Sequence, residues 1–140
     1  MNDRHDSRKE LFDEWPDRYD DWFQTPIGSL VKRYECDLLL ELLQPQQGET
    51  ILDVGCGTGI FSIEILSRSP GIVGLELSRP MITRALKKAR GYPFQPVVGN
   101  MMSLPFSDGV FDKTVSMTAL EFVADAAAAV AELFRVTRKG

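Results

Sequence analysis

The glycine-rich segment DVGCGTG at residues 53–59 constrains this chain more than any other part of its sequence. It lies between a short β-branched run, ILDV at 51–54, and an apolar helical pattern that begins at Ile60. Glycines let the main chain turn tightly with positive φ, and they let a ligand approach the backbone without meeting a Cβ. The N–H groups at the start of the following helix favour electron-rich ligand atoms. The segment therefore predicts a loop that binds a nucleotide-like ligand.

Two common phosphate-binding loops match this segment poorly. The dinucleotide fingerprint G-x-G-x-x-G, counted from Gly55, needs a third glycine at position 60, which is Ile60. A Walker loop needs a G-K-[ST] sequence, and none follows. Asp53 would repel a pyrophosphate, whereas it could hold a cationic ammonium group of a ligand. A nicotinamide-dependent oxidoreductase, which only the glycine loop suggests, is therefore a minor alternative.

Strands and helices alternate along the chain in a pattern typical of a parallel sheet. Strands are predicted at residues 51–54, 72–76, 96–99 and 111–117, and helices at residues 29–44 and 60–66, after the N-cap Ser78, and at 125–137. Right-handed crossovers between parallel strands place helices on both faces, so we predict an α/β fold with a Rossmann-like, open, mainly parallel sheet. The ligand crevice of such a sheet lies beyond the carboxyl ends of its strands. The cofactor-binding domain is predicted at residues 28–140.

The residues that follow the second and third predicted strands complete a nucleoside site. Glu76 ends the second strand, where its carboxylate can accept hydrogen bonds from both hydroxyls of a ribose. Leu77 and Met81 can flank a flat adenine ring, because apolar and polarisable side chains suit it. Asn100 and Met101 follow the third strand and can contact the edge of the adenine through a side-chain amide and a main-chain N–H.

Four motifs, in order, carry a resemblance to a known family: ILDVGCGTGIFSIEIL, VGLELSRPMITRA, GNMMSLPFSDGVFDKTVSMTALEFVAD and AELFRV. From about Tyr19 to Gly140 the chain resembles the class I S-adenosylmethionine-dependent methyltransferases, specifically their type 11 small-molecule subgroup. The resemblance implies S-adenosyl-L-methionine as cofactor, S-adenosyl-L-homocysteine as product, and in-line transfer of the methyl group to a small-molecule acceptor. It identifies no catalytic base. The cofactor residues that it implies, together with those argued above, are Tyr19, Asp53, Gly55, Cys56, Gly57, Gly59, Glu76, Leu77, Met81, Asn100, Met101, Met117 and Thr118.

The sequence departs from the family pattern at two places. Asn100 stands where the family usually has an aspartate, and its amide oxygen can still accept a hydrogen bond from the adenine amino group. The family also continues past the region of Arg135 and Val136 into three further strands that this sequence does not contain. The fourth strand would then be a sheet edge with unpaired backbone groups. Three explanations are open: a C-terminally truncated chain, pairing with a second chain, such as a homo-oligomer, or marginal stability. The alternative function is accordingly a non-catalytic module that binds adenosylmethionine or adenosylhomocysteine and acts through a partner chain.

Three further features of the sequence allow a functional and a structural interpretation. Residues 1–27 form an acidic and aromatic lead-in, in which Tyr19, Trp22 and Phe23 either cover the cofactor as a lid or attach the first helix to the sheet. Cys56 is interpreted as a small space-filling residue whose main-chain N–H faces the ligand. The basic cluster at residues 79–90 is interpreted as a solvated helix face.

Composition limits the remaining classes. The net charge of −4 argues against nucleic acid as a partner, because such proteins neutralise phosphates with basic side chains. No apolar run reaches the roughly 18 residues of a membrane span, and the charged first residues do not form a signal segment. With one histidine, His5, and two cysteines, Cys36 and Cys56, the sequence provides no zinc ligand set and suits a reducing, cytoplasmic compartment.

Overall fold

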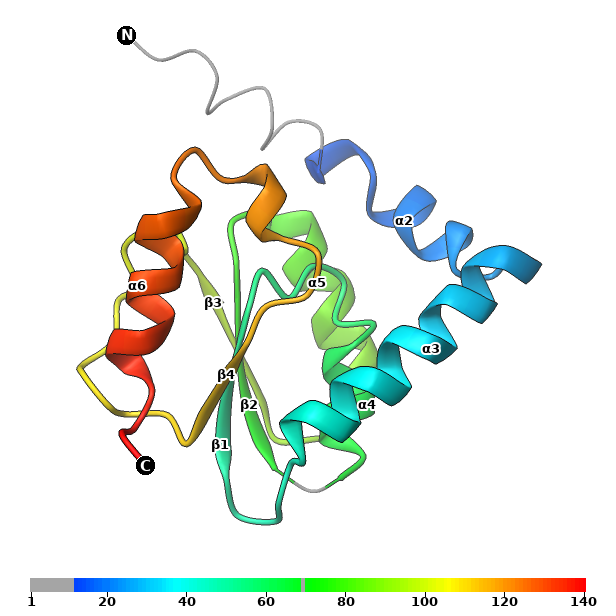
Figure 1. The fold of residues 1–140 in the computed structure, drawn as a ribbon. Coiled ribbons are helices and arrows are strands. Elements are labelled where there is room, and N and C mark those ends of the chain that lie inside the picture. Colours follow the sequence, from blue (N-terminus) through cyan, green and yellow to red (C-terminus); the bar gives the residue numbers. More distant parts are fainter. Residues whose placement is uncertain (1–11, 69) are drawn as a thin grey trace, which may run out of the picture.

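A parallel sheet of four strands organises the molecule in the computed structural model, which describes residues 12–68 and 70–140 (Figure 1). The strands are β1 (Thr50–Val54), β2 (Gly71–Glu76), β3 (Phe94–Val98) and β4 (Lys113–Val115), and their order in the sheet is β3-β2-β1-β4. In the centre of the sheet Leu52 is in register with Val73 on one side and Thr114 on the other. The predicted α/β, Rossmann-like fold is confirmed.

Helices cover both faces of this sheet. The described helices are α2 (Pro16–Trp22), α3 (Pro26–Leu43), α4 (Ser62–Leu66), α5 (Arg79–Lys88), the short 3₁₀ helix η1 (Leu120–Phe122) and α6 (Ala126–Val136). α3, α4 and α5 lie on one side of the sheet, and α6 lies on the other (Figure 1). Successive residues of a strand point to opposite faces of the sheet, so each face has its own core cluster. Ile51 and Ile72 pack in the core cluster that contains Leu39 of α3, whereas Leu52 and Leu75 pack with Val136 of α6 on the opposite face.

Capping residues explain where the helices begin. Ser78 caps α5, as predicted: its hydroxyl accepts a hydrogen bond from the N–H of Met81 at 3.4 Å. α3 begins at Pro26, three residues before the predicted start, because the Thr25 hydroxyl accepts from the N–H of Gly28 at 3.0 Å and proline suits the first turn. Two strand predictions were inaccurate in extent: β3 begins at Phe94 rather than at residue 96, and β4 covers Lys113–Val115 rather than residues 111–117.

The two edges of the sheet differ in their backbone chemistry. β3 forms one edge and contains Pro96, which has no N–H to donate. β4 forms the other edge, and the end of the described chain runs beside its beginning, where Thr137 pairs with Phe111 in a parallel bridge. The hydroxyls of Thr114 and Thr137 lie 2.9 Å apart. The β4 edge, predicted to be open, is therefore partly covered by the chain itself.

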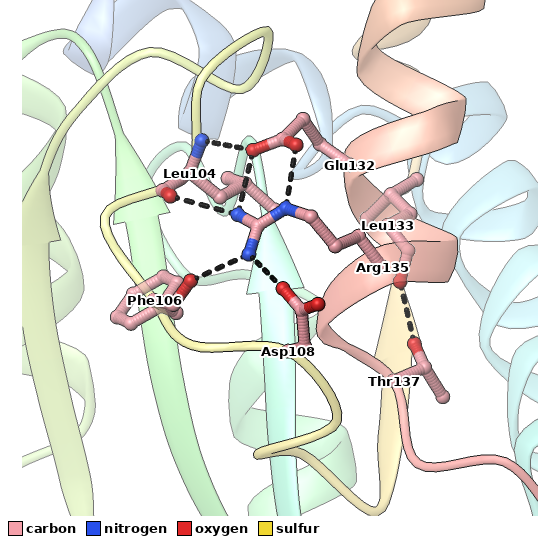
Figure 2. A network of polar contacts seen from close by, with 7 residues as sticks. All are labelled: Leu104, Phe106, Asp108, Glu132, Leu133, Arg135 and Thr137. Atoms are coloured by element: carbon pink, nitrogen blue, oxygen red, sulfur yellow. Dashed lines mark hydrogen bonds and ion pairs between the residues drawn. The ribbon is translucent and has the colours of Figure 1, made fainter.

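A charged cluster fixes the loop after β3 to α6 (Figure 2). The guanidinium group of Arg135 donates to both carboxylate oxygens of Glu132 at 2.7 and 2.8 Å, and to the carbonyl oxygens of Leu104 and Phe106 at 3.1 and 2.8 Å. Glu132 in turn accepts from the N–H of Leu104 at 2.7 Å. These hydrogen bonds from Arg135 are the main cause that lowers the pKa of Glu132 to about 2. The cluster positions a loop whose first residues, 99–102, lie at the carboxyl edge of the sheet.

Replacement of Arg135 by lysine tests the importance of this cluster. A lysine keeps the charge but cannot reach two carbonyl oxygens and a carboxylate with fixed planar geometry, so we expect the midpoint of thermal unfolding to fall by several degrees. Arg90→Lys is the matched control, because Arg90 is exposed and makes no polar contact within residues 12–68 and 70–140. Equal melting temperatures for the two variants would show that the cluster does not stabilise the loop.

Candidate functional site

A cavity of about 630 Å³ opens beyond the carboxyl ends of the strands, where a parallel sheet is expected to bind its ligand. Most of the predicted cofactor residues line it: Tyr19, Gly55, Gly57, Glu76, Leu77, Met81, Asn100, Met101, Met117 and Thr118. Three do not, namely Asp53, Cys56 and Gly59. The wall also contains residues that sequence reasoning did not select, among them Phe12, Trp15, Arg18, Glu35, Met102 and Phe122. The loop, the two strand ends and the N-terminal segment therefore meet at one site.

The glycine loop is fastened to the end of β2 by its own backbone. The N–H groups of Gly55 and Cys56 both donate to the carbonyl oxygen of Leu75, at 2.7 and 3.1 Å. The expectation that the main-chain N–H of Cys56 faces the ligand was therefore wrong, because this N–H already has a partner in the sheet. The Cys56 side chain is buried, as a space-filling residue should be, and a Cβ built on Gly74 would lie 3.0 Å from its Sγ.

Each glycine of the loop has positive φ, and two of them also allow a close approach by another element. Gly55 has φ of 75°, and a Cβ there would lie 2.5 Å from the Cβ of Ala119. Gly59 has φ of 76°, and a Cβ there would lie 3.0 Å from the Cβ of Ala85 in α5. Gly59 therefore serves the packing of α5 against the loop, which explains why it lies outside the cavity wall.

Substitution of Gly59 by alanine separates packing from backbone strain. Gly59→Ala adds a Cβ in a left-handed conformation and against Ala85, so we expect it to destabilise the fold by about 2 kcal/mol or more. Gly91→Ala is the matched control, because Gly91 has a similar φ of 87° but nothing within 4 Å of its Cβ position. Urea unfolding of both variants measures the difference. If Gly91→Ala costs as much as Gly59→Ala, the contact with Ala85 contributes nothing.

The carboxylate of Glu76 is held in place by three main-chain donors. One oxygen accepts from the N–H groups of Leu77 and Ser78 at 2.8 and 3.0 Å, and the other accepts from the N–H of Gly57 at 3.1 Å. Burial raises the pKa of Glu76, and these hydrogen bonds oppose that increase by favouring the ionised form. Since Glu76 also lines the cavity, the structure orients an acceptor-only group toward a ligand at the strand ends.

Asp53 lies beneath the glycine loop and does not line the cavity. Its side chain is 3% exposed, and one oxygen accepts a hydrogen bond of 2.5 Å from the hydroxyl of Ser62 in α4. Burial raises its pKa to about 6, the Ser62 hydrogen bond opposes the rise, and the charge of Glu76 adds to it. The sequence analysis predicted direct contact between this carboxylate and an ammonium group of the ligand. In the structure Asp53 is buried and does not line the cavity, so that contact is not available.

The raised pKa of Asp53 predicts a pH dependence of stability. Below about pH 4 the carboxyl is neutral in both folded and unfolded chains; above about pH 6 the folded protein must hold a buried charge. The free energy of unfolding should therefore fall as the pH rises from 4 to 6. We expect Asp53→Asn, which keeps an oxygen for Ser62, to gain up to about 3 kcal/mol relative to the wild type over this range.

Urea unfolding of both proteins at pH 4, 5, 6 and 7 measures this effect. The informative quantity is the difference between wild type and Asp53→Asn, because carboxylates that do not interact with Asp53 titrate equally in both proteins. A difference that stays constant over these pH values would contradict the raised pKa of Asp53.

The N-terminal segment makes two kinds of contact. Its aromatic side chains line the cavity, and its aspartates form ion pairs with α5. Tyr19 and Trp22 of α2 line the cavity, as does Trp15 just before it. Phe23, directly after the last residue of α2, packs against Phe61 of the core, with ring centroids 5.9 Å apart. Phe23 also lines the cavity, and Tyr19 also packs against that core. Packing of these rings against the core is therefore observed, and a lid over a cofactor stays a prediction.

On the acidic side, Asp20 binds both the glycine loop and α5. It accepts from the Thr58 hydroxyl at 2.6 Å and pairs with the ammonium group of Lys88 at 2.5 Å. Asp17 pairs with Arg84. Arg84 and Lys88 are thus ion-pair partners, and the prediction of a wholly solvated basic face was wrong for these two residues. Acids at positions 17 and 20, three residues apart and therefore on one helix face, were the sequence signal for this contact.

The end of the cavity beside β4 contains Tyr19, Thr118 and Glu35. Burial raises the pKa of Tyr19 to about 12, a hydrogen bond with Thr118 opposes this, and the negative charge of Glu35 adds to it. Thr118 has φ of 49°, a left-handed conformation that is uncommon for a non-glycine residue and often marks a functional site. At the opposite side of the cavity, after β3, the side-chain oxygen of Asn100 accepts from the N–H of Met102 at 2.9 Å.

Comparisons with known proteins agree with this arrangement. A family model described as a methyltransferase domain matches residues 52–140. The chain is 31% identical over 133 residues to demethylmenaquinone methyltransferase of Beutenbergia cavernae, which covers 93% of this chain and 53% of that protein. It is 33% identical over 113 residues to malonyl-[acyl-carrier protein] O-methyltransferase of Serratia marcescens, which covers 81% of this chain and 44% of that protein.

A solved structure shows the same fold. Phosphoethanolamine N-methyltransferase 1 of Haemonchus contortus, in complex with phosphoethanolamine and S-adenosylhomocysteine, superposes with a TM-score of 0.82 at 14% identity, over 96% of this chain and 30% of that one. The parallel sheet is thus that of the Rossmann-like methyltransferases. The chain belongs to the class I S-adenosylmethionine-dependent methyltransferase family. It spans about half or less of the length of the curated relatives that it matches.

Within residues 12–68 and 70–140 no group of three or more histidine, cysteine, aspartate or glutamate side chains is arranged to hold a metal ion. In the same part of the chain no helix is long and apolar enough to cross a membrane. His5 lies outside the described residues.

Proposed function

We propose that this protein binds S-adenosylmethionine in the cavity at the strand ends and transfers its methyl group to a small-molecule acceptor. The observation that carries the proposal is the Glu76 carboxylate, held by three main-chain N–H groups on the cavity wall next to the glycine loop. An oriented acceptor-only group at the end of the second strand suits the two hydroxyls of a ribose. The volume of about 630 Å³ falls within the range typical of small-molecule sites.

The residues present fit such a cofactor along its length. Leu77 and Met81 would flank the adenine ring, and Asn100 and Met101 would lie at its edge, since all four line the cavity on the side of β2 and β3. The Asn100 oxygen already accepts from Met102, which leaves the amide NH₂ and one lone pair for the ligand. Gly55 lines the cavity, and its lack of a Cβ would leave the main chain open to the ligand.

At the end beside β4, the chain would align the reaction and exclude water. Bound S-adenosylmethionine supplies a methyl group on a positively charged sulfur, open to in-line displacement. Tyr19 and Trp22 present aromatic side chains to this end of the cavity, where ring faces stabilise a neighbouring cation. The ion pairs of Asp17 and Asp20 with α5 hold these rings over the site. Alignment and exclusion of water require no covalent step on the protein.

Titration calorimetry with S-adenosylhomocysteine tests the proposal. We expect binding by the wild type, and we expect Glu76→Gln to weaken it by about 1 to 3 kcal/mol, because charge-assisted hydrogen bonds to the ribose are lost. Glu41→Gln is the control, since Glu41 lies on the exposed side of α3. Thermal melts establish that the variants are folded. Unchanged affinity in a folded Glu76→Gln variant would remove the ribose assignment, and no binding by a folded wild type would remove the proposed function.

A further inference from the structure

The cavity contains a second carboxylate, that of Glu35 on α3. The Glu35 side chain is half-buried, and within residues 12–68 and 70–140 no hydrogen bond or ion pair involves it. A carboxylate that is partly covered and has no partner is stabilised when a cation or an N–H donor binds to it. Glu35 therefore differs from Glu76, whose oxygens already accept from three main-chain donors.

The other charges on the cavity wall do not offset Glu35. Among residues 12–68 and 70–140, Arg18 is the one cation on the cavity wall. It is exposed, with its guanidinium carbon 5.7 Å from the centre of the Trp15 ring, and Glu121 is also exposed. An anionic acceptor would therefore meet an unpaired carboxylate inside the cavity. A neutral apolar acceptor would leave the Glu35 charge desolvated and unpaired, which is also unfavourable.

The surroundings of Glu35 suit a small apolar molecule with a positively charged or N–H-donating group. Val31, one helical turn before Glu35, lines the same cavity, and so do Trp22 and Tyr19. Aromatic faces attract cations as well as apolar groups. Glu35 also acts on the Tyr19 hydroxyl through its charge, so the two groups lie at the same end of the site as Thr118.

We propose that Glu35 selects the methyl acceptor by binding its nitrogen, so that the acceptor is a small apolar amine. The inference rests on the proposed methyltransferase function and adds the chemical class of the acceptor. Glu35 is then a specificity-determining residue on the acceptor side of the cavity.

The chemistry of amine methylation gives this carboxylate a second effect. An amine that binds as its ammonium first loses a proton to water. The lone pair of the neutral nitrogen then forms the N–C bond as the C–S bond breaks, and the bonding pair remains on sulfur. Positive charge therefore moves from sulfur to nitrogen, and the methylated ammonium product loses a proton to water. A carboxylate that accepts a hydrogen bond from the reacting N–H stabilises the charge that develops on nitrogen.

Calorimetry on protein saturated with S-adenosylhomocysteine tests the inference with three matched probes: 2-phenylethylamine, 2-phenylethanol and phenylacetate. We expect the amine to bind at least tenfold more tightly than the alcohol and the acid. Glu35→Gln should lose at least tenfold in amine affinity and keep its affinity for S-adenosylhomocysteine. Glu41→Gln, on the exposed side of the same helix, should change neither, and thermal melts should show that both variants are folded.

The outcomes separate this inference from the proposed function. If the folded wild type does not bind S-adenosylhomocysteine, the proposed function itself fails. If it binds S-adenosylhomocysteine but prefers phenylacetate or the alcohol, or binds none of the probes, the amine class is overturned. If Glu35→Gln weakens S-adenosylhomocysteine as much as it weakens the amine, Glu35 belongs to the cofactor site, and its role in acceptor selection is overturned.

Discussion

The site depends on one carbonyl oxygen, that of Leu75, which accepts from two consecutive N–H groups of the glycine loop. This pair of hydrogen bonds fixes the loop after β1 against the end of β2, so that Glu76 and Gly57 come within hydrogen-bonding distance. Positive φ at the loop glycines makes such a tight return of the chain feasible. The loop thereby functions as a rigid part of the sheet edge, and a ligand there would meet groups that are already oriented, which reduces the entropic cost of binding.

The N-terminal segment is joined to this loop by charge rather than by apolar packing alone. Asp20 contacts the Thr58 hydroxyl and the Lys88 ammonium, and Lys88 also donates to the carbonyl oxygen of Thr58 at 3.1 Å. Burial lowers the pKa of Lys88, and the hydrogen bond with Asp20 counteracts this. The glycine loop, α2 and α5 therefore share one partly buried polar cluster, and a displacement of α2 would leave the charge of Lys88 and the Thr58 hydroxyl without their partner Asp20.

The sequence was sufficient to predict the succession of strands and helices along the chain from residue 29 onward, because apolar periodicity and capping residues are local signals. It also placed the glycine loop and Glu76 at the same edge of the sheet, since the carboxyl ends of parallel strands lie together, and both line the cavity there. It did not reveal that Asp53 is covered by the loop backbone or that the N–H of Cys56 is used by Leu75, because both depend on how two strand ends meet. Glu35 was missed for a similar reason: on a helix whose buried residues are Gly28, Cys36 and Leu39, nothing in the sequence shows that one glutamate reaches a cavity.

Pro96 makes the two edges of the sheet unequal in their ability to pair with a further strand. The N–H of Gly99 donates to the carbonyl oxygen of Glu76, and the carbonyl oxygen of Pro93 accepts from the N–H of Ile72. The backbone groups of odd-numbered residues in β3 therefore point toward β2. The nitrogen of Pro96, an even-numbered residue, points away from the sheet. A strand arriving on that side would find no donor at the middle of β3. On the opposite side, Arg138 already donates to the carbonyl oxygen of Phe111 beside the start of β4, with the register of a parallel neighbour. Any further strand, from this chain or another, would therefore be recruited next to β4, while the β3 side stays a natural boundary of the sheet.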